Sequence, residues 1–221
     1  MVGMFRALAS FIQSALDVIL PRKERALRID EYRIEHMPVV PREHEVSGVQ
    51  ITTLMSYRDQ AVEDCIRALK YDKSAHAAQL LADILAEYLR EEIASLRSFS
   101  TKQVLLVPIP LHPRRFRERG FNQVGLVLER LPEEFKNGEL SMIAFSIIER
   151  VRETPPQTRL SRAERLANMK DAFALTDMNA ALDSHIILID DVTTTGATLA
   201  EAARPLINLG ASVSLLAFAH A

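Results

Sequence analysis

Short apolar runs alternate with helical patterns along most of the chain. Helical spacing of apolar residues predicts helices over about 59–71 and 74–96, the second capped by Ser74, and a further helix from Asn122 to about Arg130. Apolar runs of strand length lie at 49–58, 103–109, 141–148, 185–189 and 212–218. Because continuous apolar strands separated by helices are typical of a parallel sheet covered on both faces, we predict an α/β fold. In such folds the ligand lies beyond the carboxyl ends of the strands.

The first 48 residues have a different pattern. Residues 1–21 form an amphipathic helical pattern that ends at Pro21 and falls short of the ~20 apolar residues of a membrane span. We expect its apolar face to pack on the protein, with docking to a membrane surface or a partner as the alternative. The stretch that follows is charged, punctuated by proline and without sustained periodicity, so it predicts loop with short strands. We therefore divide the chain into an N-terminal helix and irregular segment (1–48) and a main domain (49–221).

Composition and charge narrow the class of protein. The 221 residues are 48% hydrophobic and 25% charged, which is typical of a globular protein with a real core. A net charge of −2 and the absence of Trp disfavour nucleic acid as a partner, although this partner stays open. Cys65 is the lone cysteine, which predicts a cytoplasmic protein without disulfides, and a buried apolar role for this residue. His36 and His44 match no metal-ligand spacing, so a solvated loop is the better interpretation.

The sharpest chemical signal is the run HIILIDDVTTTGATL, residues 185–199. An apolar strand leads into Asp190 and Asp191, and a Thr-rich turn around Gly196 then opens a helix. Glycine lets the backbone approach a ligand, hydroxyl groups donate hydrogen bonds, and the free N–H groups of a first helical turn attract a phosphate. Adjacent carboxylates would repel that phosphate unless they serve another part of the ligand. A sugar diol with Mg²⁺ nearby satisfies both groups.

This run resembles the phosphoribosyl-pyrophosphate motif of type I phosphoribosyltransferases. The resemblance implies that Asp190 and Asp191 are catalytic and hold the ribose and Mg²⁺, the metal mostly through substrate and water. It also implies that the turn holds the 5′-phosphate through Thr193, Thr194, Thr195, Gly196, Ala197 and Thr198. A helix cap or a simple strand-to-helix turn would explain the threonines but not the adjacent acids after a buried strand.

Two further segments, VLLVPIPLHPRRFRERGFNQVG and RVRETPPQTRLSRAERLANMKDAF, extend the resemblance to the ComF-like branch of this family. In the first, arginines in a loop after an apolar strand would stabilise the departing pyrophosphate, with Arg114 and Arg115 as catalytic residues. Leu111, His112 and Arg119 would contact substrate beside them. The second lies where relatives carry a mobile lid, and the matching residues are Arg152, Thr154, Gln157, Thr158 and Arg165. Solvated basic surface is the alternative for each segment taken alone.

The sequence departs from the ComF-like pattern in two ways. Relatives commonly carry an N-terminal cysteine-rich zinc module, whereas no cysteine precedes Cys65 here, so we expect Mg²⁺ and no zinc. Pro205 lies inside the helix predicted after the phosphate turn, which predicts a kink or an early end there. The fold implied by the resemblance is a type I phosphoribosyltransferase-like parallel sheet with helices on both faces, plus a mainly helical N-terminal hood that holds the acceptor.

The implied activity is transfer of phosphoribose between phosphoribosyl pyrophosphate and a nitrogen base or amine, with release or uptake of pyrophosphate. Phosphoribosyl pyrophosphate or a nucleotide is the expected partner, and a homodimer stays open. Two alternatives remain: a regulator that binds phosphoribosyl pyrophosphate or a nucleotide without turnover, and a ComF-type accessory in DNA uptake and processing during competence.

Overall fold

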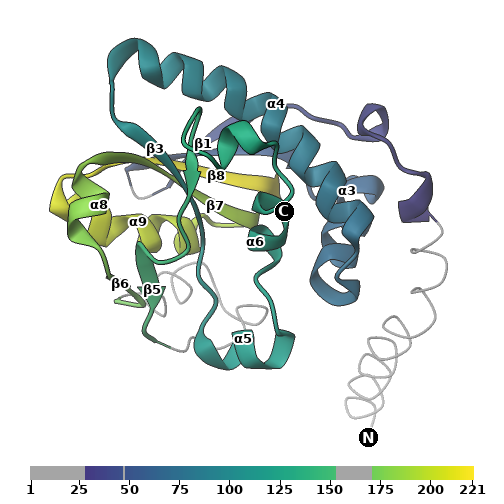
Figure 1. The fold of residues 1–221 in the computed structure, drawn as a ribbon. Coiled ribbons are helices and arrows are strands. Elements are labelled where there is room, and N and C mark those ends of the chain that lie inside the picture. The colour runs from purple at the N-terminus through teal and green to yellow at the C-terminus, as the bar shows by residue number, and fades with distance from the viewer. Residues whose placement is uncertain (1–27, 47, 153–170) are drawn as a thin grey trace, which may run out of the picture.

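A computed structural model describes residues 28–46, 48–152 and 171–221 (Figure 1). The helix predicted over residues 1–21 lies outside the described residues. So do four of the five residues matched to the lid, namely Thr154, Gln157, Thr158 and Arg165.

A six-stranded sheet forms the centre of the described chain, in the order β1-β2-β8-β7-β3-β4. Its central strands β2, β8, β7 and β3, with the short β4, run parallel to their neighbours, whereas β1 is antiparallel to β2. The strand bounds are β1 Arg42–Val46, β2 Val49–Ser56, β3 Gln103–Pro108, β4 Met142–Ile143, β7 Ser184–Thr193 and β8 Ser212–His220. The predicted mostly parallel sheet is confirmed.

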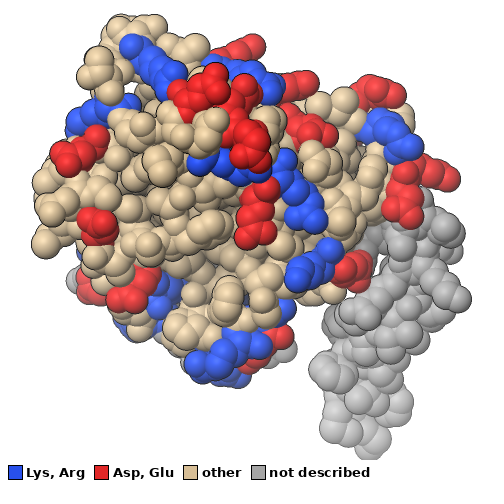
Figure 2. Space-filling model, viewed as in Figure 1, with Lys and Arg blue, Asp and Glu red and all other residues tan. Residues whose placement is uncertain are grey.

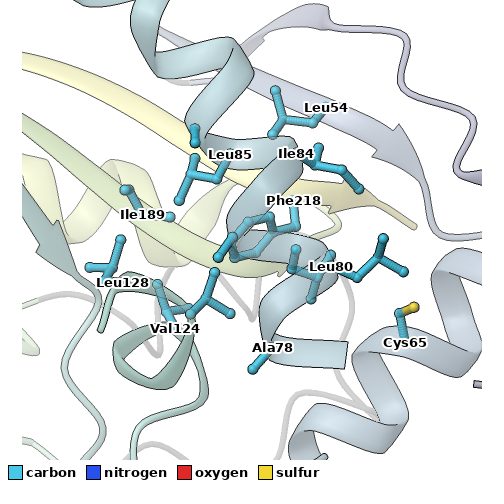
Figure 3. Close-up of a cluster of buried hydrophobic side chains, with 14 of the residues drawn as sticks. Leu54, Cys65, Ala78, Leu80, Ile84, Leu85, Val124, Leu128, Ile189 and Phe218 are labelled. Atoms are coloured by element: carbon cyan, nitrogen blue, oxygen red, sulfur yellow. The ribbon is translucent and has the colours of Figure 1, made fainter. Parts of the chain in front are cut away.

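Helices cover both faces of this sheet, as predicted. On one face α3 (Gln60–Arg67), α4 (Ala75–Phe99) and α6 (Gln123–Leu128) pack against β2, β7 and β8. Figure 3 shows this cluster, in which Leu85 of α4 and Val124 of α6 lie beside Phe218 and Ile189 of the sheet. On the other face lie α8 (Met178–Leu182), which buries Ala181, and α9 (Ala197–Leu209), which buries three alanines and two leucines in the cluster with β7 and β8.

The helix predicted over 74–96 is observed as α4 and begins as expected, because the Ser74 Oγ accepts a hydrogen bond from the Ala77 N–H at 3.2 Å. Just before it, α3 continues into a π-helical turn, η2 (Ala68–Asp72), which ends at Lys73 in the left-handed conformation. Cys65 of α3 is fully buried, and burial raises the pKa of its thiol to about 12. The expected apolar role of Cys65 is therefore confirmed.

Residues 28–46 pack on the sheet domain. β1 pairs with β2 from Arg42↔Thr53 to Val46↔Val49, and Arg28 forms an ion pair of 2.8 Å with Asp64 of α3. Two short 3-10 turns, η1 (Ile34–His36) and η3 (Glu133–Phe135), also lie within the described residues. The boundary drawn at residue 49 therefore falls at the β1–β2 hairpin.

One strand prediction is wrong. The apolar run 141–148 is divided between β4 and β5 (Ile148–Arg150), and β5 pairs antiparallel with β6 (Phe173–Leu175) in a separate two-stranded sheet. The Ala144 N–H still bonds the Leu106 carbonyl, but Phe145 is half exposed, and the chain leaves the central sheet there. The run is apolar because its first part packs in the central sheet beside β3 and its last part packs in the small sheet beside β6.

Three boundaries also differ from the prediction. The arginines after β3 lie on a helix, α5 (Pro113–Arg119), and not in a loop, because Pro113 favours a first turn, the His112 side chain caps it and Gly120 ends it at φ 78°. β7 extends to Thr193, so the acidic pair belongs to the strand. α9 passes through Pro205 and ends at Leu209, so the early end does not occur.

Candidate functional site

The acidic pair lies in the last third of β7, where the ladder with β8 still holds the backbone. Asp190 is opposite Ala217, and Thr193 is opposite His220. Because successive residues of a strand point to opposite faces, the two carboxylates meet different neighbours. Asp191 is 4% exposed, and Asp190 is partly buried.

Asp191 is held by groups from two helices on one face. Its Oδ2 is 2.9 Å from the Lys70 Nζ and accepts a hydrogen bond of 2.8 Å from the Gln123 Nε2. Its Oδ1 accepts from the Val192 N–H. Burial opposes the charge of Lys70, but the Asp191 carboxylate outweighs it and raises the pKa of Lys70. The buried carboxylate is thus neutralised within the protein.

Lys70 owes this position to the π-helical turn η2. A π-turn adds one residue to the helical turn, which changes the direction of the side chains that follow, and such turns are frequent at functional sites. Lys70 was not predicted as a site residue, and neither was Gln123. The phrase RGFNQ offered a signal for Gln123, whereas no sequence signal marks the π-turn.

Asp190 faces a different environment. Its Oδ1 accepts a hydrogen bond of 2.8 Å from the Asp191 N–H, and its Oδ2 accepts none within the described residues. Burial and the charge of Asp191 raise the pKa of Asp190 to about 7, against the opposing effects of that N–H, Lys70 and Arg150. A carboxyl group in this state gains its full charge when a cation or a hydrogen-bond donor arrives.

Arg150 of β5 is a further cation that was not predicted for the site. Burial lowers the pKa of its guanidinium, the nearby Arg115 lowers it further, and Asp190 raises it. Its guanidinium also lies 5.5 Å from the ring centre of Phe173. Because β5 belongs to the small separate sheet, no pattern in the sequence places Arg150 near Asp190.

A cleft of about 370 Å³ opens beside Asp191, between η2 and α5. Arg119 donates a hydrogen bond to the Gln123 Oε1, which links this cleft to the Asp191 carboxylate. The cleft is lined by Lys70, Tyr71, Arg115, Glu118, Arg119 and Phe121. Lys70 is paired with Asp191, so Arg115 and Arg119 against Glu118 give the cleft its positive character. Figure 2 shows basic side chains gathered over the part of the surface where α5 lies.

The remaining residues predicted around α5 have other neighbours. Arg114 forms an exposed ion pair of 2.9 Å with Glu118 and does not line the cleft. The His112 Nδ1 accepts a hydrogen bond from the Arg114 N–H, and both Leu111 and His112 are partly buried. Arg152 is exposed just beyond β5. The structure therefore brings Arg115 and Arg119 to the cleft but directs Arg114 toward its helix neighbour.

The predicted phosphate turn lies at the start of α9. Gly196 has φ 72°, and a Cβ added there would lie 2.6 Å from both the Ile51 Cδ1 and the Val46 Cγ2. Gly196 occupies the N-cap position, and no side chain of the described residues caps the helix. The first N–H groups of this 13-residue helix therefore keep their hydrogen-bonding capacity for an anion. Thr193 is buried, Thr194 is exposed, and Thr195 and Thr198 are partly buried, whereas Ala197 is buried.

Two other features bear on cofactors and location. Among the residues with described positions, no group of three or more His, Cys, Asp or Glu side chains could hold a metal ion. A metal at Asp190 and Asp191 would therefore need further ligands from substrate and water. In the same residues, no helix has the length and hydrophobicity that crossing a membrane requires.

Sequence comparison identifies relatives in bacteria. The DNA utilization protein YhgH of Salmonella typhimurium is 35% identical over 148 residues, which cover 66% of this chain and 61% of that protein. The competence protein ComFC of Bacillus subtilis is 36% identical over 120 residues, which cover 54% of this chain and 45% of that protein. The ComFC protein of Streptococcus pneumoniae is 30% identical over 164 residues, which cover 74% and 64%. The chain thus matches less than two thirds of the length of these relatives.

Two other comparisons concern models of protein families and solved structures. No model of a known protein family matches the chain. A crystal structure of the orotate phosphoribosyltransferase of Mycobacterium tuberculosis, in complex with Fe(III) dicitrate, aligns over 87% of this chain and 81% of that one, with a TM-score of 0.34 and 13% sequence identity.

Proposed function

The chain belongs to the ComF-like family, and we propose that it binds phosphoribosyl pyrophosphate with Mg²⁺ and transfers phosphoribose to a nitrogen acceptor. One observation carries this proposal: the partly buried Asp190 and the uncapped N-terminus of α9 lie on one continuous strand-turn-helix connection. Such a connection presents carboxylates and free N–H groups to the same ligand.

The turn at the start of α9 suits a terminal phosphate. Gly196 is buried against Ile51 and Val46 of the β1–β2 hairpin, which fixes the position of the turn, and the helix dipole favours a negative charge at this end. The hydroxyl groups of Thr194, Thr195 and Thr198 lie in or beside the turn. These groups would hold the 5′-phosphate.

The carboxylates suit the sugar. Asp190 has an oxygen without a hydrogen bond among the described residues, and this oxygen is available for a ribose hydroxyl. Carboxylate oxygens are also the ligands that Mg²⁺ prefers, and this cation commonly uses only one or two protein carboxylates together with substrate phosphates and water. Asp190 and Asp191 would hold it, and when bound it neutralises part of the charge of the diphosphate.

The cleft between η2 and α5 suits the leaving pyrophosphate. Lys70, Arg115 and Arg119 supply positive charge at fixed positions, which stabilises charge that develops on departing oxygens. In the transfer, the bond from C1 of the ribose to the pyrophosphate oxygen breaks with its electron pair on oxygen. The lone pair of the acceptor nitrogen forms the new bond, and an amine acceptor then releases its N–H proton to solvent, whereas a pyridine nitrogen has no proton to release and stays as the pyridinium.

The names of the relatives favour a second function. Proteins named for DNA utilization and for competence resemble this chain at 30–36% identity. An accessory role in DNA uptake and processing, without turnover of phosphoribosyl pyrophosphate, is therefore the alternative. A labelled single-stranded oligonucleotide, titrated at low and high salt, would reveal such binding.

Calorimetric titration with phosphoribosyl pyrophosphate and Mg²⁺ tests the main proposal. We expect binding by the native chain and its loss in the Asp190→Asn, Asp191→Asn double variant. Asp83→Asn, an exposed acid on α4, is the matched control and should bind as the native chain does. A screen of bases and amines for pyrophosphate release then separates turnover from binding. If the native chain does not bind phosphoribosyl pyrophosphate, the proposal is wrong.

A further inference from the structure

A second cavity, of about 390 Å³, lies at the carboxyl ends of β2 and β8. We propose that it binds a single flat ring that carries a carboxylate, and that such a ring is the acceptor of the transfer reaction. The acceptor role rests on the proposed function, whereas binding of the ring does not. The cavity has the volume of a site for a small ring compound.

Two arginines give the cavity a positive charge that nothing in the described structure balances by contact. Arg42 begins β1, and Arg58 follows β2; both side chains are exposed. Neither guanidinium forms an ion pair or a hydrogen bond within the described residues. The one acid in the lining, Asp59, accepts a hydrogen bond of 2.9 Å from the Ala61 N–H as the cap of α3. A guanidinium without a partner is suited to bidentate contact with a carboxylate.

A stacked pair of imidazoles supplies a planar surface. The rings of His44 and His220 have centroids 4.3 Å apart and planes within 13°. Burial, His220 and Arg42 lower the pKa of His44, which favours the neutral ring. The Thr53 hydroxyl lies 3.0 Å from the His44 Nε2 and 3.4 Å from the Arg42 carbonyl oxygen.

Apolar groups and hydroxyls complete the lining. Pro38, Val40 and Met55 add apolar surface, and Thr53 and Ser56 add hydroxyl groups. Flat rings bind well where apolar surface and ring systems lie beside a few polar groups. The cavity thus combines contacts for a ring with contacts for an acidic substituent.

The position of the cavity relative to β7 supports its use for an acceptor. His220 is opposite Thr193 in the β7–β8 ladder and opposite Ser56 in the β2–β8 ladder. The cavity therefore lies on the β8 side of β7, whereas the cleft proposed for pyrophosphate lies on the β3 side. A displacement requires the nucleophile and the leaving group on opposite sides of the reacting carbon, and an acceptor held in this cavity would approach from the β8 side of β7.

Nicotinate and anthranilate are suitable probes, and nicotinamide is a neutral ring of the same shape as nicotinate. We expect the native chain to bind at least one of the two acids in a calorimetric or ligand-observed NMR titration up to about 10 mM. Nicotinamide should bind about tenfold or more weakly than nicotinate, because it lacks the charge that Arg42 and Arg58 contact.

Variants locate the binding. The Arg42→Gln, Arg58→Gln double variant should weaken binding of the acid about tenfold or more, while Arg90→Gln, an exposed arginine of α4 paired with Glu134, should not. Affinity for phosphoribosyl pyrophosphate, measured on the same samples, should stay unchanged in both. The inference is wrong if the native chain binds phosphoribosyl pyrophosphate but neither acid. It is also wrong if the double variant binds the acid as tightly as the native chain does, or if nicotinamide binds as tightly as nicotinate. If the acid binds with the expected loss of affinity in the double variant and phosphoribosyl pyrophosphate does not bind, the ring-binding site is supported. The acceptor role is then wrong, together with the proposed function.

Discussion

The two regions that flank the end of β7 differ in how their charges are compensated. On the β3 side, Asp191 is buried, and Lys70 and Gln123 contact it directly. On the β8 side, the guanidinium groups of Arg42 and Arg58 have no contacting partner among the described residues. A compensated, buried charge contributes to folding as well as to binding, whereas an exposed, uncompensated charge contributes to binding alone. The comparison therefore predicts opposite consequences for mutations in the two regions.

The largest effect is expected at Lys70. Replacement by methionine leaves the Asp191 carboxylate buried without its cation, and we expect a loss of about 3 kcal/mol in the free energy of unfolding, measured in urea. Lys136→Met, which removes a partly exposed pair with Glu133, should cost less than about 0.5 kcal/mol. Adding Asp191→Asn to Lys70→Met should restore part of the loss. If the urea midpoint of Lys70→Met equals that of the native chain, the pair of Lys70 and Asp191 does not stabilise the fold.

Gly196, at the start of α9 beyond the end of β7, packs on the β1–β2 hairpin. An alanine there would adopt a left-handed φ and place its Cβ 2.6 Å from Ile51 and Val46, so we expect a loss of about 2–3 kcal/mol and weakened binding of phosphoribosyl pyrophosphate. Gly120→Ala is a close control because Gly120 has φ 78° and open space around its Cβ position. It should lose only about 1 kcal/mol. Equal losses in the two variants would show that the contact with the hairpin does not matter.

The pH dependence of stability distinguishes Asp190 from its neighbour. Because burial and Asp191 raise the pKa of Asp190 to about 7, the folded chain holds a proton there that the unfolded chain releases near pH 4. This group therefore lowers stability as the pH rises from about 4 to about 7. Asp190→Asn removes the effect, and thermal unfolding of the unliganded protein should show it at least about 1 kcal/mol more stable than the native chain at pH 8. At pH 4.5 the two proteins should unfold together, and a variant no more stable at pH 8 would contradict the raised pKa.

The smallest effect is expected at Arg42. Since its side chain is exposed and unpaired within the described structure, Arg42→Gln should change the free energy of unfolding by less than about 0.5 kcal/mol. Urea unfolding checks this value on the same preparations that are used for ligand binding. A loss above about 1 kcal/mol would mean that the guanidinium supports the fold, and the contrast between the two regions would disappear.

The sequence predicted the elements that depend on local pattern. Apolar runs identified β3, β7 and β8, and the spacing of apolar residues identified α3 and α4. Asp190, Asp191 and the turn at Gly196 were recognisable because one short segment carries the strand, the acids and the helix start. These features need no knowledge of how distant segments meet.

Features that depend on tertiary contacts were not predictable in the same way. Lys70 reaches Asp191 only because of a π-turn, and Arg150 approaches Asp190 only because β5 leaves the central sheet. The helix α5 was missed because its seven residues are too few to show an apolar period, although Pro113 and Gly120 mark its ends. Residue patterns thus identified the acids, while their counter-ions became visible only in three dimensions.

Because α3 and α4 are joined through the π-turn at Ala68–Asp72, a change of one residue in the length of this connection matters. Removing one residue there would favour ordinary α-helical winding and turn the lysine amine by roughly 100° about the helix axis. The amine would then point elsewhere, even though the chain kept every side chain that the carboxylate needs. A one-residue deletion in this segment would therefore be as damaging as loss of the lysine itself, whereas a change of similar size in an exposed connection would leave the protein intact.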